Sequence, residues 1–406
     1  MLKLLKILLA IFHFVLLIFV IHLNINQYYE PKSIRHNGGV LDGEILNQLN
    51  YLKNKIHEGE ADKMQEFFPE GFVFFNAVYC LTWIEFAQKL DKNDLLFEEA
   101  SDEIEWAIKE VNSDKAKETF EQNLPLEYGA FYQGWSTLIL AEKLSLLKSK
   151  GLTLVDEDEY LWKCEQIATA LNESPFSYLQ SYSSGTWQAD NLICVVALVK
   201  HDKLFSPKYT QTIKNWIDKV RRDLHSNTGL ISHSDNKRNP RGSSQSLINV
   251  FLPQIDTVFA KEVFEKYKLN FLDKRLGLIG VREYPKGMEG VGDVDSGPVI
   301  WDIGGVASIV GIKAMAVNKE YGIAKSLRNN IEGLSCPIST KNGKSYFFNC
   351  FAMADAFIAW ANVTSIDNKV IDSDTNNKIL FHFISLFLIF LISGIIYALL
   401  RKIINP

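Results

Sequence analysis

Four carboxylates lie where a helical chain could use them for proton transfer. Asp293 and Asp295 belong to the glycine-rich stretch GVGDVDSGP, Glu289 comes directly before it, and Asp190 follows SYSSGTWQA. Two carboxylates whose surroundings push their pKa values apart can serve as acid and base in one reaction. We therefore take Asp190, Glu289, Asp293 and Asp295 as the candidate catalytic residues.

The two aspartates of the glycine-rich stretch also have a purely structural interpretation. Pro298 suits the first position of a helix, so Asp295, shortly before it, can accept hydrogen bonds from amides at the helix start. Asp293 can bond the turn in which it lies. Asp302 would then lie one turn into an apolar helix and would need a partner such as Arg241, Arg282 or a backbone donor. The catalytic and the structural interpretation both stay open at this point.

Other kinds of site find less support in the sequence. Five cysteines and eight histidines show no zinc-ligand spacing, and GMEGVGDVDSG lacks the Lys-Ser/Thr that completes a phosphate loop. SHSDNKRNPRGSSQ holds His233, Asp235 and several serines, but at no spacing that establishes a triad. We expect neither a metal nor a cofactor. With a net charge of −5, we expect no nucleic-acid partner either.

Hydrophobic periodicity predicts the scaffold that would position the carboxylates. Six segments are apolar on nearly every face, as expected of helices buried on all sides, and they begin near residues 73, 134, 191, 246, 299 and 350. Six amphipathic, charged segments alternate with them, starting near residues 44, 97, 156, 208, 256 and 319. This alternation predicts an all-α fold, an (α/α)6 toroid in which six outer helices surround six inner ones.

The stretches that precede the predicted inner helices are where a site would form. Each carries glycine, and aromatic and polar residues gather in the same places. All inner helices of a toroid begin at one end, so these stretches would meet at one mouth, where helix N-termini favour carboxylates. The residues expected to bind substrate there are Glu70, Tyr132, Trp135, Trp187, Arg241, Gln245, Trp301 and Asp302.

The pattern resembles the six-hairpin toroid superfamily. EYGAFYQGW, PRGSSQ and GDVDSGPVIW are most similar to membrane-attached relatives of the linalool dehydratase/isomerase-like proteins, whereas toroid glycoside hydrolases and polysaccharide lyases are similar in architecture alone. The first resemblance implies a hydro-lyase or isomerase that acts on an isoprenoid-type alcohol. No catalytic residue carries over, because the chain has no counterpart of a catalytic cysteine pair.

Both ends of the chain predict membrane-spanning helices. Residues 7–23 and 379–400 are apolar with few interruptions, and each run suffices to cross a bilayer. Lysines precede the first run, and Arg401 and Lys402 follow the second, so the positive-inside rule places both termini in the cytoplasm. A cleaved signal peptide is the alternative for the first run, but no small-residue cleavage site follows it. We favour an uncleaved, two-pass inner-membrane protein.

These observations divide the chain into six parts. We expect an anchor at 1–24, a linker at 25–43, the toroid at 44–364, a second linker at 365–377, a transmembrane helix at 378–401 and a cytoplasmic tail at 402–406. The toroid would lie outside the cytoplasm, in the periplasm.

Three functions fit this plan. The leading hypothesis is an enzyme that uses carboxylate acid/base chemistry on a glycan or an envelope glycoconjugate. The second is the isoprenoid hydro-lyase or isomerase, and the third is a non-catalytic binding or scaffold protein of the envelope. An open, aromatic-floored groove would suit sugars, a closed apolar cavity would suit isoprenoids, and a filled mouth would suit a scaffold.

Overall fold

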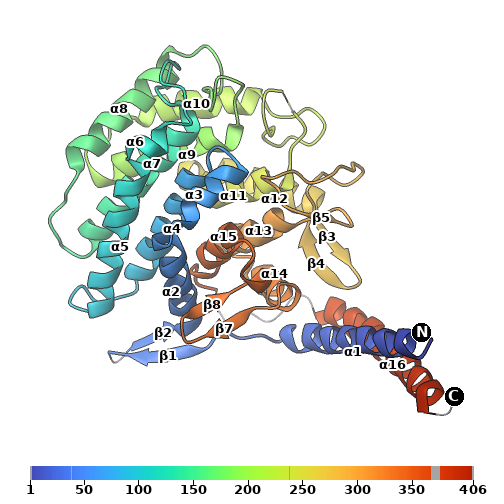
Figure 1. Ribbon diagram of the computed structural model, residues 1–406. Helices are drawn as coiled ribbons and strands as arrows, with labels where there is room; N and C mark the ends of the chain where they lie inside the picture. The colour runs from blue at the N-terminus through green and yellow to red at the C-terminus, as the bar shows by residue number, and fades with distance from the viewer. Residues whose placement is uncertain (1, 38, 237, 367–374, 405–406) are drawn as a thin grey trace.

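The computed structural model describes residues 2–37, 39–236, 238–366 and 375–404. Helices dominate these ranges, and the strands form only short antiparallel pairs (Figure 1). The predicted helical class is therefore confirmed.

Six of the described helices are buried on nearly every side because hydrophobic residues occupy their whole circumference. They are α4 (Gly71–Ala87), α7 (Gly129–Ser149), α9 (Gln188–Leu204), α11 (Gly242–Ile255), α13 (Gly305–Val317) and α15 (Ala352–Asn362). Each of these buried helices packs against the next in chain order, and α15 packs against α4. All six correspond to segments that the sequence predicted as inner helices.

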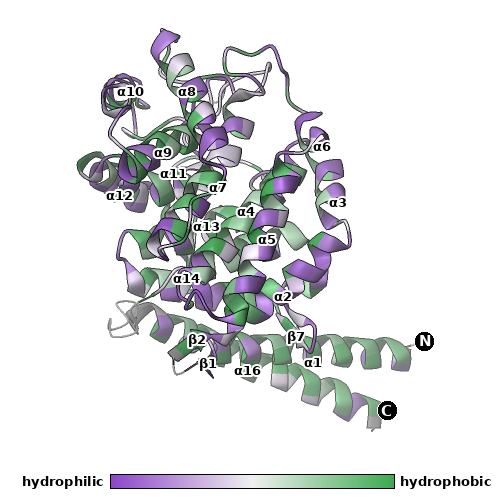
Figure 2. Cartoon of the chain, turned by 90° about the vertical axis from the view of Figure 1, so that its left-hand side faces the viewer, coloured by the Kyte–Doolittle hydropathy of each residue, from purple (hydrophilic) through white to green (hydrophobic). Residues whose placement is uncertain are grey.

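Six peripheral helices alternate with the buried ones along the chain. They are α2 (Gly43–His57), α5 (Leu95–Val111), α8 (Glu157–Glu173), α10 (Thr210–Arg222), α12 (Thr257–Phe271) and α14 (Tyr321–Leu334). In α10, Ile213, Trp216 and Val220 are buried, whereas Lys214 and Arg222 face solvent. Figure 2 shows the same contrast, with hydrophilic residues along α10 and α12 and hydrophobic ones along α4 and α13.

Short elements connect these helices. They are α3 (Glu60–Phe67), α6 (Asp114–Lys117), the 3-10 helix η1 (Phe347–Asn349), and the hairpins β1–β2 (Ser33–His36, Gly39–Asp42), β3–β4 (Leu272–Arg275, Leu278–Val281), β5–β6 (Val299–Ile300, Ile303–Gly304) and β7–β8 (Ile338–Thr340, Gly343–Ser345). We call the region from α2 to α15 the central domain.

The hairpin β5–β6 corrects the sequence prediction at the fifth buried helix. That helix begins at Gly305, not near residue 299, so Pro298 is not its first residue. Trp301 and Asp302 form the hairpin turn with φ of 50° and 68°, the left-handed values that a two-residue type I′ turn needs at both central positions. Hydropathy alone could not separate this apolar hairpin from the apolar helix that follows. Asp302 therefore lies in a turn and not inside a helix.

The two terminal helices, α1 (Leu2–Asn26) and α16 (Thr375–Ile404), are long and apolar enough to cross a membrane. They pack side by side and antiparallel, because Lys6 contacts the backbone of Lys402 while Asn24 bonds His382 Nδ1 at 2.7 Å. Both termini therefore lie at the same end of the pair (Figure 1). Residues 367–374 of the predicted second linker and residues 405–406 of the predicted tail lie outside the described residues.

A buried charge cluster joins the beginning and the end of the central domain. Lys344 Nζ in β8 lies 2.8 Å from Glu44 of α2 and 2.9 Å from Glu332 of α14. The hydroxyl of Tyr346 donates to Glu332 at 2.7 Å, and Gln48 donates to Tyr346 at 2.7 Å. Because a buried ion pair must be fully hydrogen-bonded to offset its desolvation, these contacts fix how α2 sits against α14 and β8.

We expect Lys344→Ala to destabilise the protein by about 3–5 kcal/mol, because it leaves Glu44 and Glu332 buried without their cation. Lys55→Ala, which breaks an exposed pair with Glu58 on the same helix α2, should cost less than about 1 kcal/mol. Urea denaturation of both variants in detergent gives the comparison. Equal losses in the two variants would contradict the structural role of the cluster.

Candidate functional site

A cavity of about 820 Å³ lies between the starts of several buried helices and the terminal helices. Its volume is in the range of small-molecule sites, roughly 300–1,000 Å³. Most lining residues are apolar, and the wall includes Leu23 of α1 and Phe381 of α16. The polar side chains that the central domain gives to this lining include Glu70, Tyr182, Asp190, His233, Ser243, Ser244 and Asp295. Hydrogen bonds or charges link Glu70, Tyr182, Asp190 and Asp295 with one another, and we call these four residues the polar region. The cavity is thus an apolar chamber with one polar region.

Three carboxylates reach the polar region from three separate elements. Glu70 is the residue before α4, Asp190 lies in the first turn of α9, and Asp295 lies in the loop that precedes β5. They are close enough for the charges of Glu70 and Asp295 to act on Asp190. The structure thus brings Asp190 and Glu70 together from the starts of two buried helices, and Asp295 joins them from a loop ten residues before α13.

Burial raises the pKa of Asp190 to about 8. Its side chain is only 8% exposed, and desolvation disfavours the charged form of a carboxyl group. A hydrogen bond with Ser181 opposes this shift, and the charges of Glu70 and Asp295 add to it. Burial and the charge of Asp295 also raise the pKa of Glu70. At neutral pH, Asp190 therefore holds a proton that it can donate.

Tyr182 organises the carboxylate group. Its hydroxyl hydrogen-bonds Glu70, and burial raises the pKa of the Tyr182 phenol, so that it stays a donor. The ring stacks on Phe120 and Phe131 with centroids 6.0 Å away, and meets Trp187 edge to face at 5.2 Å. Such aromatic contacts favour one ring orientation, which holds the hydroxyl toward Glu70. Tyr182 lies in SYSSGTWQA, the stretch before Asp190, but it was not among the residues predicted to bind substrate.

A histidine–serine pair lines the same cavity. His233 Nδ1 lies 2.6 Å from Ser244 Oγ, in the first turn of α11. Asp235, two residues after this histidine, accepts hydrogen bonds from the backbone amides of Thr186 and Asn236 instead and lines another cleft. The carboxylate of Asp235 therefore stabilises the loop before α9. Sequence spacing could not find the pair, because eleven residues and a helix start separate its members.

Asp293 has the structural role that the sequence left open. Burial alone would raise the pKa of Asp293, but the hydrogen bonds and charge of Arg241 lower it to about 2. Arg241 also pairs with the buried Glu283 at 2.8 Å, and Asp293 accepts the backbone N–H of Ser296 at 3.0 Å. Asp293 is thus an ionised anchor for the loop that presents Asp295.

The remaining predicted residues divide into two groups. Trp187 and Trp301 line the cavity, and Asp302 lies next to it, paired with Arg275 at 2.8 Å and Arg282 at 3.0 Å. The others lie away from the cavity lining: Tyr132 and Trp135 are buried in the aromatic core, Gln245 is buried and donates to the carbonyl of Ile231, and Glu289 is exposed. Neither Glu289 nor these core residues can reach a ligand in the cavity.

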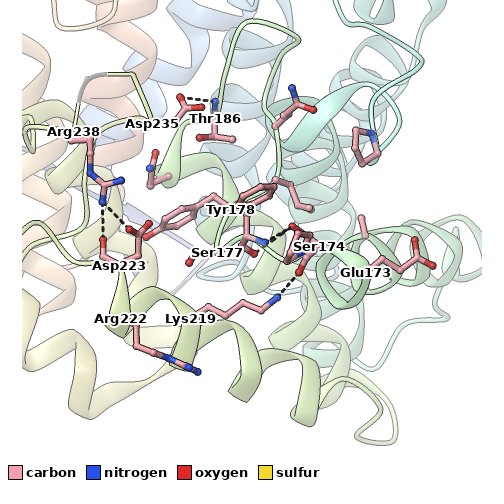
Figure 3. A pocket seen from close by; sticks show the side chains of 17 residues that line it. Glu173, Ser174, Ser177, Tyr178, Thr186, Lys219, Arg222, Asp223, Asp235 and Arg238 are labelled. Atoms are coloured by element: carbon pink, nitrogen blue, oxygen red, sulfur yellow. Dashed lines mark hydrogen bonds and ion pairs between the residues drawn. The ribbon is translucent and has the colours of Figure 1, made fainter.

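A larger cleft of about 1,020 Å³ lies against α8 and α10 (Figure 3). Its charged side chains are used in local contacts. Arg238 pairs with Asp223 at 2.8 Å, and Lys219 donates to the carbonyl of Ser174 at 2.7 Å. We place the candidate site in the smaller cavity because two carboxyl groups with raised pKa, those of Glu70 and Asp190, line it.

Within the part of the chain that the structure describes, no group of three His, Cys, Asp or Glu side chains could hold a metal ion. No family model matches the sequence, and a search of curated proteins gives no significant match. Function must therefore be inferred from the geometry and charges of the cavity.

The raised pKa of Asp190 predicts a pH dependence of stability. Its pKa of about 8 exceeds the ordinary 3.8, so the folded protein holds a proton that the unfolded chain releases between those values. The protonated carboxyl group of Asp190 therefore makes its full contribution to the free energy of unfolding below about pH 4. That contribution falls as the pH rises and is lost once the pH has passed about 8. Asp190→Asn should flatten this decline, and urea denaturation from about pH 4.5 to 8.5 measures it.

Glu289→Gln, which removes an exposed carboxylate, is the matched control and should give a curve parallel to that of the wild type. If Asp190→Asn also gave a parallel curve, the carboxyl group of Asp190 would not be protonated in the folded protein.

Proposed function

We propose that the central domain is an (α/α)6 toroid and that the protein is a membrane-anchored enzyme that performs general acid/base chemistry on an apolar substrate. The closed series of contacts from α4 through α15 and back to α4 supports the toroid. One observation carries the function: Asp190, buried so that its pKa is raised to about 8, lies with Glu70 and Asp295 in the polar region of an otherwise apolar cavity.

The chemistry that fits this arrangement best is the loss of water from an alcohol, or its reverse. The carboxyl group of Asp190 gives its proton to the hydroxyl oxygen, and the C–O bond breaks as water leaves. The carboxylate of Glu70 or Asp295 then takes a proton from the neighbouring carbon, and the electrons of that C–H bond form the double bond. Return of this proton to Asp190 restores the site. Tyr182 positions Glu70 for the step.

The lining favours an isoprenoid-type alcohol over a glycan. Every sugar hydroxyl that enters an apolar chamber needs a hydrogen-bond partner, whereas a hydrocarbon chain gains from burial there. A glycan is the second candidate, because Trp187 and Trp301 line the cavity together with two carboxylates that could act on a glycosidic bond. The cavity volume of about 820 Å³ argues against a purely structural, non-catalytic role, for which we expected side chains to fill this region.

We also propose a two-pass topology with both termini in the cytoplasm and the toroid outside. The antiparallel packing of α1 and α16 supports it, since Lys6 and Lys402 share one end of the pair and the central domain lies at the other.

Cys350 offers a test of topology, because it is the exposed cysteine among five free ones. A membrane-impermeant maleimide should label the protein in intact cells with the outer membrane permeabilised. Cys350→Ser should lose most of that labelling. Labelling only after the inner membrane is broken would place the central domain in the cytoplasm and overturn the topology.

Activity can be tested on linalool and nerolidol, with gas chromatography for dehydration products and ¹⁸O-water for exchange of the hydroxyl. Asp190→Asn should lower kcat/KM by roughly 10²–10⁴-fold, the usual contribution of a general acid. The wild-type rate should fall above about pH 8, as Asp190 loses its proton. Glu70→Gln should also lower the rate.

Glu289→Gln is the control and should keep wild-type activity, because that carboxylate is exposed and outside the cavity lining. Full activity in both Asp190→Asn and Glu70→Gln would refute the acid/base assignment. Turnover of oligosaccharides but not of these alcohols would favour the glycan.

A further inference from the structure

Two neighbouring hairpins present large apolar side chains at their turns. Leu276 follows β3 with φ of 53°, and Trp301 follows β5 with φ of 50°. Turns of this kind normally carry Asn, Asp or Gly, because a bulky side chain is strained in the left-handed region. Here the turn residues Leu276 and Trp301 are also exposed, by 50% and 64%, and so is Ile300, the last residue of β5, by 64%. Neither solubility nor turn geometry explains why these exposed positions carry large apolar side chains.

The two turns are held together and lie beside the terminal helices. Arg275 Nε donates to the carbonyl of Trp301 at 2.9 Å, and the same guanidinium pairs with Asp302 at 2.8 Å. Strand β4 contacts α16, and Figure 1 shows the β3–β4 hairpin reaching toward it. Leu276, Ile300 and Trp301 line the same cavity as Leu23 and Phe381 of the terminal helices. One wall of the cavity is therefore built from helices that are long and apolar enough to cross a bilayer.

The charges inside the cavity restrict which molecules can enter it. Arg275, the arginine of the lining, is neutralised by Asp273 at 2.7 Å and Asp302 at 2.8 Å. The carboxylates of Glu70 and Asp295 would repel a phosphate or a carboxylate head group. An uncharged molecule with a hydroxyl group at one end of a hydrocarbon chain meets neither obstacle.

We propose that the tips of β3–β4 and β5–β6 insert into the membrane leaflet beside α16, and that the opening between these tips and the terminal helices admits an uncharged, hydroxyl-bearing lipid from the bilayer. Tryptophan and aliphatic side chains suit this position, since Trp is favoured at the membrane interface and Leu and Ile below it. The substrate class rests on the proposed function, whereas insertion of the tips does not.

The insertion test uses the full chain in phosphatidylcholine nanodiscs, with the photoreactive residue benzoylphenylalanine placed at 276, at 300 or at the control position Leu95. Leu95 is 80% exposed and begins α5, on the side of the domain away from α16. Intact-mass measurement should show phospholipid adducts at 276 and 300 at least about tenfold above those at 95. Equal adducts at the three positions would overturn membrane insertion.

The access route is tested by turnover of a long and a short alcohol. The double variant Leu276→Asp/Ile300→Asp should lower kcat/KM for membrane-dissolved nerolidol by about tenfold or more, mainly through KM. The loss for the water-soluble 2-methyl-3-buten-2-ol should be much smaller, and urea denaturation of the double variant shows separately that it is folded. Leu95→Asp should change neither. Unchanged nerolidol kinetics in the double variant would overturn the route.

The two proposals fail in different ways. Adducts at 276 and 300 need no turnover, so they would persist in Asp190→Asn even if that variant were fully active and the acid/base assignment wrong. Missing adducts together with a strong loss of activity in Asp190→Asn would instead refute the membrane opening alone.

Discussion

The buried contact of Lys344 with Glu44 and Glu332 is the constraint on which the rest of the structure depends. It fixes the first peripheral helix, α2, against the end of the central domain, where α2 packs on α15 and α4. With this junction closed, the starts of several buried helices face a common cavity, and the chain ends emerge close enough for α1 and α16 to pair. The cost of burying three charged groups is offset by their mutual hydrogen bonds and by the packing they allow.

The acidic residues around the cavity show that the fold can raise the pKa of a carboxyl group at the expense of stability. Asp190 lies in the first turn of a helix that is buried on nearly every side, so its ionisation is unfavourable throughout the neutral range. Asp293, only two residues from Asp295, is ionised because Arg241 faces it. Local surroundings, and not residue type, thus decide which acid holds a proton and which anchors a loop.

Sequence periodicity predicted the helices well, because a helix that is apolar on all faces has a distinct composition. It failed at residues 299–304, where a hairpin is as hydrophobic as the helix that follows. The site was predicted in part. Asp190 and Glu70 line the cavity because helix starts carry them, and Asp295 joins them from the loop before β5. Tyr132 and Trp135 are core residues that composition alone cannot separate from pocket residues. The hydrogen bond between His233 and Ser244 could not be predicted either, because no characteristic spacing in the sequence indicates it.

The polar contacts between α1 and α16 have a consequence for how the protein can be divided. Asn24 bonds both His382 and Ser385, at 2.7 and 2.8 Å, close to the residues that these helices contribute to the cavity wall. The two terminal helices are therefore structural parts of the cavity. A fragment without them would keep the carboxyl groups of the central domain but lose one wall of the cavity, and solvent would reach the compartment that keeps Asp190 protonated.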